Sequence, residues 1–95
     1  MHRFEAELWL HDGEAGWCFV ALPGALSDDV RARAPGARTG FGSVRVQATI
    51  GGTTWATSLF PDSARGAYVL PVRKPVRAAE GLEVGDVVSV GLEVV

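Results

Sequence analysis

The sequence has 95 residues, of which 47% are hydrophobic and 21% are charged, and its formal net charge is −2. A chain of this length and composition folds as one domain around a single core, which excludes intrinsic disorder. The negative net charge argues against attraction of the whole domain to nucleic acid or anionic lipid, although it leaves room for a local basic face.

The single cysteine, Cys18, has no disulfide partner within the chain, and it lies in an apolar run where any small hydrophobic residue would serve. Residues 1–30 contain neither a basic segment followed by a long apolar run nor an apolar span of about 18 residues. We therefore expect no signal peptide, no membrane helix and a cytoplasmic location. The frequent use of Ala, Gly, Val and Arg would suit a GC-rich bacterial genome.

The first segment, residues 3–10, alternates between apolar and polar side chains, which is typical of a strand with one buried face. This alternation places Trp9 on the same face as Arg3 and the acidic residues, so its side chain is expected to be half-exposed or to contact a ligand or partner. Turn-forming residues follow at 11–16. The almost wholly apolar run 17–22 then predicts a central strand paired with the first.

A short helix is predicted over residues 27–34, after Pro23-Gly24 ends the second strand. Ser27 is placed to cap its N-terminus, with acidic residues in the first turn and arginines in the last, an order that the helix dipole favours. Pairing between residues four apart is expected to neutralise much of the arginine charge. Residues 36–42 are expected to form a surface loop.

Alternation resumes over residues 43–50 and continues over 53–60, with Gly51-Gly52 between the two segments. Two strands separated by two glycines predict a β-hairpin, because both glycines can adopt the positive φ of a tight primed turn. A polar loop at 61–66 leads into another strand over 67–72.

A second short helix is predicted to start at Lys74-Pro75, and residues 81–86 form a turn into a last strand over 87–94. Short strands therefore dominate, with helices small enough only to cap the ends. The sequence predicts a single mainly β domain over residues 1–95, a six-stranded barrel or pseudobarrel capped by two short helices. The expected core consists of Phe4, Leu8, Trp17, Phe19, Val46, Ala48, Ile50, Trp55, Leu59, Tyr68, Leu70, Val76, Val88 and Val90.

Four motifs are spread over nearly the whole chain. They are Trp17-x-Phe19-Val20-x-Leu22-Pro23, Val44-x-Val46-x-Ala48-Thr49-Ile50-Gly51-Gly52-x-x-Trp55-x-Thr57-Ser58-Leu59-Phe60-Pro61, Gly66-x-Tyr68-x-Leu70-Pro71-Val72-Arg73-Lys74-x-Val76-Arg77 and Gly81-Leu82-x-x-Gly85-Asp86. At these spacings the chain resembles the bacterial family catalogued as domain of unknown function 1905. The resemblance implies a double-split β-barrel capped by helices, whereas periodicity alone predicts only a small barrel. It implies no activity, because the family is named for its missing function.

The closing unit, residues 67–95, resembles more weakly one half of the AbrB, MazE and MraZ group. In that group swapped hairpins join a strand, a Pro-x-x-x-Arg helix and a Leu-x-x-Gly-Asp turn, and the fold is a DNA-binding dimer. The turn also has a purely structural explanation, because Gly85-Asp86 can start a strand after a tight turn in any protein. An AbrB-like regulator that binds DNA as a dimer is therefore the alternative function.

Basic residues concentrate around the start of the second helix, where Arg65, Arg73, Lys74 and Arg77 fall within thirteen positions. Cationic side chains beside free backbone N–H groups at a helix start suit a phosphate or a carboxylate. The alternative is a solvated helix face, with its charge offset by the acidic residues of 80–86.

Catalytic chemistry has little to work with in this sequence. His2 is at the terminus, His11 lies in a turn, and Cys18 is expected to be buried, with no nucleophile motif and no zinc-site spacing. We therefore predict no catalytic residue, no metal and no cofactor, and an enzyme would have to depend on His11.

These observations favour a non-enzymatic binding module for a protein partner or a small anionic ligand. Its candidate ligand-binding residues are Arg73, Lys74, Arg77 and Trp9.

Overall fold

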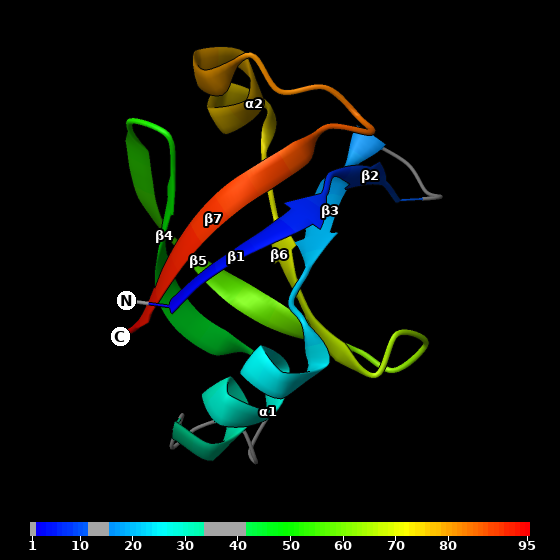
Figure 1. The fold of residues 1–95 in the computed structure, drawn as a ribbon, viewed down its shortest axis with the longest axis vertical. Helices are drawn as coiled ribbons and strands as arrows, with labels where there is room; N and C mark the ends of the chain where they lie inside the picture. The colour runs from blue at the N-terminus through cyan, green and yellow to red at the C-terminus, as the bar shows by residue number, and fades with distance from the viewer. Residues whose placement is uncertain (1, 12–15, 34–41) are drawn as a thin grey trace.

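The computed structural model describes residues 2–11, 16–33 and 42–95, and strands make up most of it (Figure 1). The elements are β1 (His2–Glu7), β2 (Trp9–Leu10), β3 (Cys18–Ala21), α1 (Gly24–Arg33), β4 (Val44–Ile50), β5 (Thr53–Asp62), β6 (Ala67–Pro71), α2 (Lys74–Glu80) and β7 (Val87–Val94). Most of the turn and loop expected at 11–16 and 36–42 lies outside the described residues.

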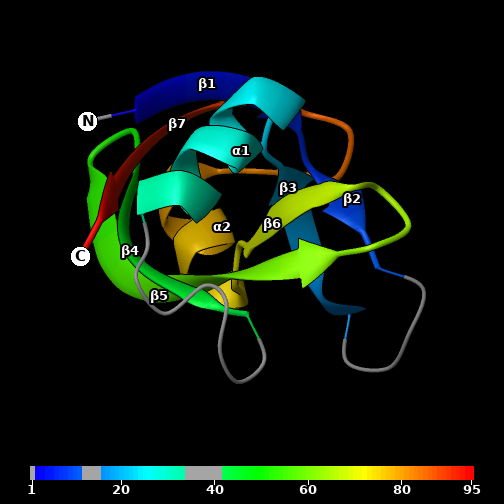
Figure 2. The ribbon, with the colours of Figure 1, turned by 90° about the horizontal axis from the view of Figure 1, so that it is seen from below.

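The seven strands form one sheet in the order β1-β7-β4-β5-β6-β3-β2, and every pair of neighbours is antiparallel. The outermost strands, β1 and β2, are consecutive in the chain, so the sheet nearly closes into a barrel. The strand β5 changes its pairing partner along its length: residues 53–59 pair with β4, and residues 60–62 pair with β6. Figure 2 looks along the barrel and shows the strands following one another around the ring. The predicted fold class is confirmed.

The count of seven strands instead of six comes from an interruption at Leu8. The Leu8 N–H donates to the carbonyl of Asp86 and the Leu8 carbonyl accepts from the N–H of Gly85, each at 2.8 Å. The turn before β7 thus takes the hydrogen bonds that a neighbouring strand would take. The Leu8 side chain is fully buried in the core, which fixes the point where the strand leaves one half of the barrel for the other.

The two helices lie at opposite ends of the barrel (Figure 1). The helix α1 begins at Gly24, so the predicted N-cap role of Ser27 and the predicted acidic first turn are wrong. The carbonyl of Pro23 accepts the N–H of Ser27 at 2.9 Å, which starts the helix one turn earlier than expected. The predicted pairing four residues apart is present, because Arg33 Nε lies 3.1 Å from Asp29 Oδ2.

The interior of the barrel holds most of the predicted core, but the expectation for the strand over 17–22 is wrong. Trp17 is 41% exposed and Phe19 is only half-buried, whereas Cys18, Val20 and Leu22 face inward. When every residue of a strand is apolar, the sequence has no alternation to show which side chains face the core. On this strand the smaller side chains of Cys18, Val20 and Leu22 fill the inside of the barrel, and Trp17 and Phe19 are left outside. Trp55 is partly buried and packs against the core.

Candidate functional site: a cationic pocket beside an aromatic face

Aromatic side chains line the outer face of the half-sheet formed by β2, β3, β6 and the end of β5. Trp9 pairs with Phe19, and Phe19 pairs with Pro71, so these three residues form one row across the strands. Side chains directly opposite one another in a sheet share a face. Val20, the next residue in β3, points into the core, so Trp9 and Phe19 lie on the outer face, whereas Pro71 of the same row is fully buried.

A parallel row lies two residues further along the strands, at the α2 end of the barrel. The N–H of His11 donates to the carbonyl of Trp17 at 2.8 Å, so these two residues continue the pairing of β2 with β3. On the other side of Trp17, the guanidinium carbon of Arg73 lies 5.3 Å from the centre of the indole ring. This row therefore runs from His11 through Trp17 to Arg73, and it ends on a cation.

Phe19 joins the two rows. Its ring centre lies 5.3 Å from that of Trp9, 5.7 Å from that of His11 and 6.1 Å from that of Trp17. Phe60, on β5, is 41% exposed at the far side of the same half-sheet. These five residues, Trp9, His11, Trp17, Phe19 and Phe60, are here called the aromatic face. They line a depression of about 340 Å³ together with Pro61, Asp62, Ser63 and Val69.

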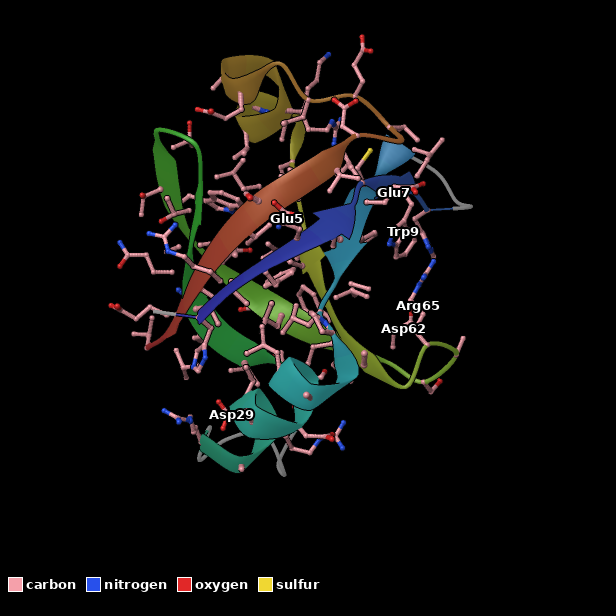
Figure 3. The ribbon with its side chains drawn as sticks, viewed as in Figure 1. Glu5, Glu7, Trp9, Asp29, Asp62 and Arg65 are labelled. Carbon is pink, nitrogen blue, oxygen red and sulfur yellow. The ribbon has the colours of Figure 1, made fainter. Side chains whose placement is uncertain are left out.

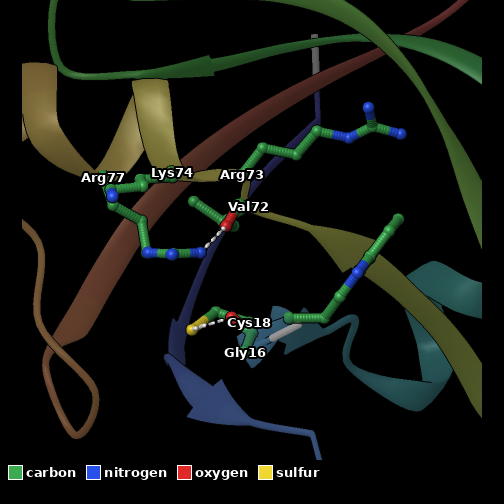
Figure 4. A pocket seen from close by; sticks show the side chains of 7 residues that line it. Gly16, Cys18, Val72, Arg73, Lys74 and Arg77 are labelled. Atoms are coloured by element: carbon green, nitrogen blue, oxygen red, sulfur yellow. Dashed lines mark hydrogen bonds between the residues drawn. The ribbon is translucent and has the colours of Figure 1, made fainter. Parts of the chain in front are cut away.

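A second pocket, of about 220 Å³, lies where β3, β6 and α2 meet (Figure 4). It is here called the cationic pocket, and its lining residues are Gly16, Trp17, Cys18, Val72, Arg73, Lys74 and Arg77. The structure therefore brings together three of the four predicted ligand-binding residues. Trp17 lines both the cationic pocket and the aromatic depression, so the two hollows are neighbours.

The three cations of the pocket are not equivalent. Arg77 is half-buried, and its Nη1 donates to the carbonyl of Val72 at 2.7 Å (Figure 4), so its guanidinium is held in place. Arg73 and Lys74 are exposed. Within the ranges that the structure describes, no carboxylate lies within ion-pair distance of any of the three. The nearby Glu80 instead accepts a hydrogen bond from Thr53 at 2.6 Å.

The start of α2 offers few backbone donors, contrary to the expectation from sequence. Pro75 has no N–H, and the N–H groups of Val76 and Arg77 both donate to the carbonyl of Arg73 at 3.0 Å. An anion in the cationic pocket would therefore be held by the side chains of Arg73 and Lys74.

Arg65 and Trp9 lie together, away from the cationic pocket. The guanidinium carbon of Arg65 is 3.9 Å from the centre of the Trp9 ring, and Arg65 Nε is 3.6 Å from Asp62 Oδ2 (Figure 3). Arg65 is therefore not part of the basic cluster expected from the sequence, and its charge is paired with that of Asp62. Trp9 is half-buried with its ring against Arg65. It also lines one side of the aromatic depression.

Among residues 2–11, 16–33 and 42–95, no three His, Cys, Asp or Glu side chains are grouped so that they could hold a metal ion. No helix in these ranges has the length and hydrophobicity needed to cross a membrane. The thiol of Cys18 is buried and lies 3.9 Å from the carbonyl of Gly16.

Residues 4–92 match the family described as a domain of unknown function, DUF1905. The chain belongs to the DUF1905 family. The match spans nearly the whole chain and confirms the resemblance drawn from the four motifs. No curated protein matches the chain. The chemistry of this DUF1905 domain therefore has to be inferred from its geometry.

Sequence reasoning missed the aromatic face, because it assigned Trp17 and Phe19 to the core and gave no role to Phe60. One signal was present. Trp9 was already placed on the polar face of its strand, and a partner strand paired with it presents its own bulky residues on that same face. The register of that pairing, Trp9 opposite Phe19, was the missing information.

Proposed function

We propose that this DUF1905 domain is a non-enzymatic binding module that holds a small organic anion in the cationic pocket. Arg73 and Lys74 bind the anionic group, and the indole of Trp17 contacts the body of the ligand. The observation that carries the proposal is the pair of exposed cations beside an exposed indole, with no carboxylate of the described residues within ion-pair distance of either cation.

The chemistry of these side chains favours a carboxylate or a phosphate. The guanidinium of Arg73 offers a planar set of donors that matches either group, and the ammonium of Lys74 adds a mobile point charge. The fixed guanidinium of Arg77 contributes positive potential from the inner wall. The pocket, at about 220 Å³, is smaller than the roughly 300 Å³ at which drug-sized ligand sites begin. Only the anionic end of a ligand is therefore expected to enter it.

Thermal unfolding in the presence of inorganic phosphate, pyrophosphate, benzoate and citrate tests this proposal. A ligand present at about ten times its Kd stabilises the folded state by about 1.4 kcal/mol, which raises Tm by roughly 6 to 11 °C for a domain of this size. The double variant R73A/K74A is expected to lose this shift while its own Tm stays nearly unchanged, because both side chains are exposed.

The matched control is Arg45→Ala, which removes an exposed arginine from β4, outside the cationic pocket. It should keep the full shift. The proposal is wrong if none of the four anions raises Tm, or if R73A/K74A responds as the unmodified protein does.

The DNA-binding dimer remains the alternative, and it requires the basic cluster twice on one surface. The other helix of this chain, α1, lies at the opposite end of the barrel, and its Arg33 is paired with Asp29. Over the residues that the structure describes, one chain thus presents the cluster of Arg73, Lys74 and Arg77 once. A chain that is dimeric in solution and retards duplex DNA at low salt, with an affinity that falls steeply as salt rises, would favour this alternative.

A further inference from the structure

We infer that the anion is a nucleobase-bearing phosphate, with its phosphate on Arg73 and Lys74 and its base on the aromatic face. This inference rests on the proposed function and names the ligand class of that site. A free mononucleotide and a nucleotide within a single strand share this chemistry.

The arrangement of the two hollows sets the shape of the ligand. The cationic pocket and the aromatic depression meet at Trp17, which lines both. The guanidinium carbon of Arg73 lies 5.3 Å from the centre of the Trp17 ring, and the ring of Phe19 is nearly parallel to that of Trp17, at 23°, with the two ring centres 6.1 Å apart. A molecule that fits both hollows has a negative group at one end and a flat apolar group within a few ångströms of it. A nucleotide has this construction.

The composition of the aromatic face favours a nucleobase over an aliphatic body. Trp9 and Trp17 each lie beside Phe19, with ring centres 5.3 Å and 6.1 Å from that of Phe19. Aromatic side chains on an open sheet beside cationic groups are the means by which proteins bind unpaired bases, since every base has a π-face that can stack. His11 and Ser63, which also line the depression, bring polar groups that can bond the edge of a base.

The charge distribution limits how much nucleic acid this face can hold. Among the described residues that line the cationic pocket, only Arg73 and Lys74 are exposed cations, and Arg65, beside Trp9, is paired with Asp62. The domain as a whole carries a net charge of −2. Two exposed cations that have no carboxylate partner among the described residues suit one or two phosphates, whereas a duplex needs a longer basic surface. The structure therefore favours one or two nucleotides over a double helix.

The experiment compares ligands that differ only by the base. Isothermal titration of the full chain with ribose 5-phosphate, UMP and AMP measures what the base adds. Both nucleotides are expected to bind roughly tenfold more tightly than ribose 5-phosphate, in line with the contribution of one base–aromatic stack. R73A/K74A should weaken all three ligands.

Variants of the aromatic face then test where the base lies. Trp17→Leu and Phe19→Leu keep an apolar side chain but remove the π-face, so UMP should fall to the affinity of ribose 5-phosphate. Phe19→Tyr keeps the ring and should keep most of the advantage, which separates stacking from any change in the fold. Val87→Ala, an exposed apolar position on β7, is the control and should leave all affinities unchanged.

The outcomes separate this inference from the proposed function. If ribose 5-phosphate binds as tightly as UMP and R73A/K74A weakens both, the inference is overturned while the anion site stands. If neither these ligands nor the four anions bind, both fail.

Binding of a single-stranded hexauridylate distinguishes a free mononucleotide from a nucleotide within a single strand as the ligand. A gain over UMP of more than tenfold, with a steep salt dependence, would support a single strand, and equal binding would support a free nucleotide. Tighter binding of a duplex of similar length would overturn the inference.

Discussion

The hydroxyl of Ser27, in α1, accepts a hydrogen bond from the backbone N–H of Tyr68, in β6, at 2.6 Å. Both residues are buried, with exposed fractions of 1% and 2%. The carbonyl of Tyr68 also accepts the N–H of Leu22 at 3.0 Å. Tyr68 is thus bonded on both sides to the segment that leads from β3 into α1, and β6 continues directly to Arg73 and the cationic pocket.

Replacing Ser27 with alanine should lower the free energy of unfolding by about 1 to 3 kcal/mol. The substitution leaves the buried N–H of Tyr68 without an acceptor, and an unsatisfied buried donor has a cost of this size. Urea denaturation followed by circular dichroism measures the change. Ser63→Ala, at an exposed position, is the control and should stay within about 0.5 kcal/mol. Equal stabilities of the two variants would contradict the role given to Ser27.

The sequence predicted well those parts of the fold in which apolar and polar residues alternate, because the alternation shows which side chains face the core. In β4, Val44, Val46, Ala48 and Ile50 are buried and the residues between them are not, as the alternation indicates. The hairpin that follows was also correct, since Ile50 pairs with Thr53 across the two glycines, although only Gly51 has the positive φ expected of both. Local spacing fixed both features, and no distant contact was needed.

The features that could not be predicted depend on contacts between distant segments. Arg73, Lys74 and Arg77 lie within one helical turn, so their proximity was visible in the sequence. The aromatic face draws on three strands, and its existence depends on the register that places Trp9 opposite Phe19. Ser27 likewise resembles a helix cap until the contact with β6 is known.

Gly51 should be far less tolerant of alanine than its neighbour Gly52. Gly51 has a φ of +57°, and a Cβ there would clash with the carboxylate of Glu80, which bonds to Thr53. Gly52 has open space at the same position, and its φ lies outside the positive range. Since the left-handed conformation alone costs a side chain about 1 to 2 kcal/mol, Gly51→Ala should destabilise by at least that amount. Gly52→Ala should change stability by less than about 0.5 kcal/mol, and chemical denaturation of the two variants makes the comparison.

Arg77 and Arg73 should respond differently to alanine although both line the cationic pocket. Arg77 donates a hydrogen bond to the carbonyl of Val72 from a half-buried position, so Arg77→Ala is expected to lower stability by about 1 kcal/mol. Arg73 is exposed, and its described contact is with the face of Trp17 at 5.3 Å, so Arg73→Ala should change stability by less than about 0.5 kcal/mol. Differential scanning calorimetry of both variants measures this. A larger loss for Arg73→Ala would mean that Arg73 has a structural role that the proposed site does not give it.

Substitution of Val20 should lower the free energy of unfolding more than substitution of Trp17, although Trp17 is the larger residue. Val20 is fully buried in the core, and truncation to alanine removes two methyl groups and leaves a cavity, at a cost of about 2 kcal/mol. Trp17 is 41% exposed, so Trp17→Phe should change the free energy of unfolding by less than about 0.5 kcal/mol.

Iodide quenching of tryptophan fluorescence gives a second measurement of the same difference. Trp17 is more exposed than Trp9 or Trp55, so most of the quenching should disappear in Trp17→Phe and persist in Val20→Ala. A large loss of stability in Trp17→Phe, or quenching that persists in this variant, would mean that Trp17 is part of the core. The aromatic face and the ligand class inferred from it would then be wrong together.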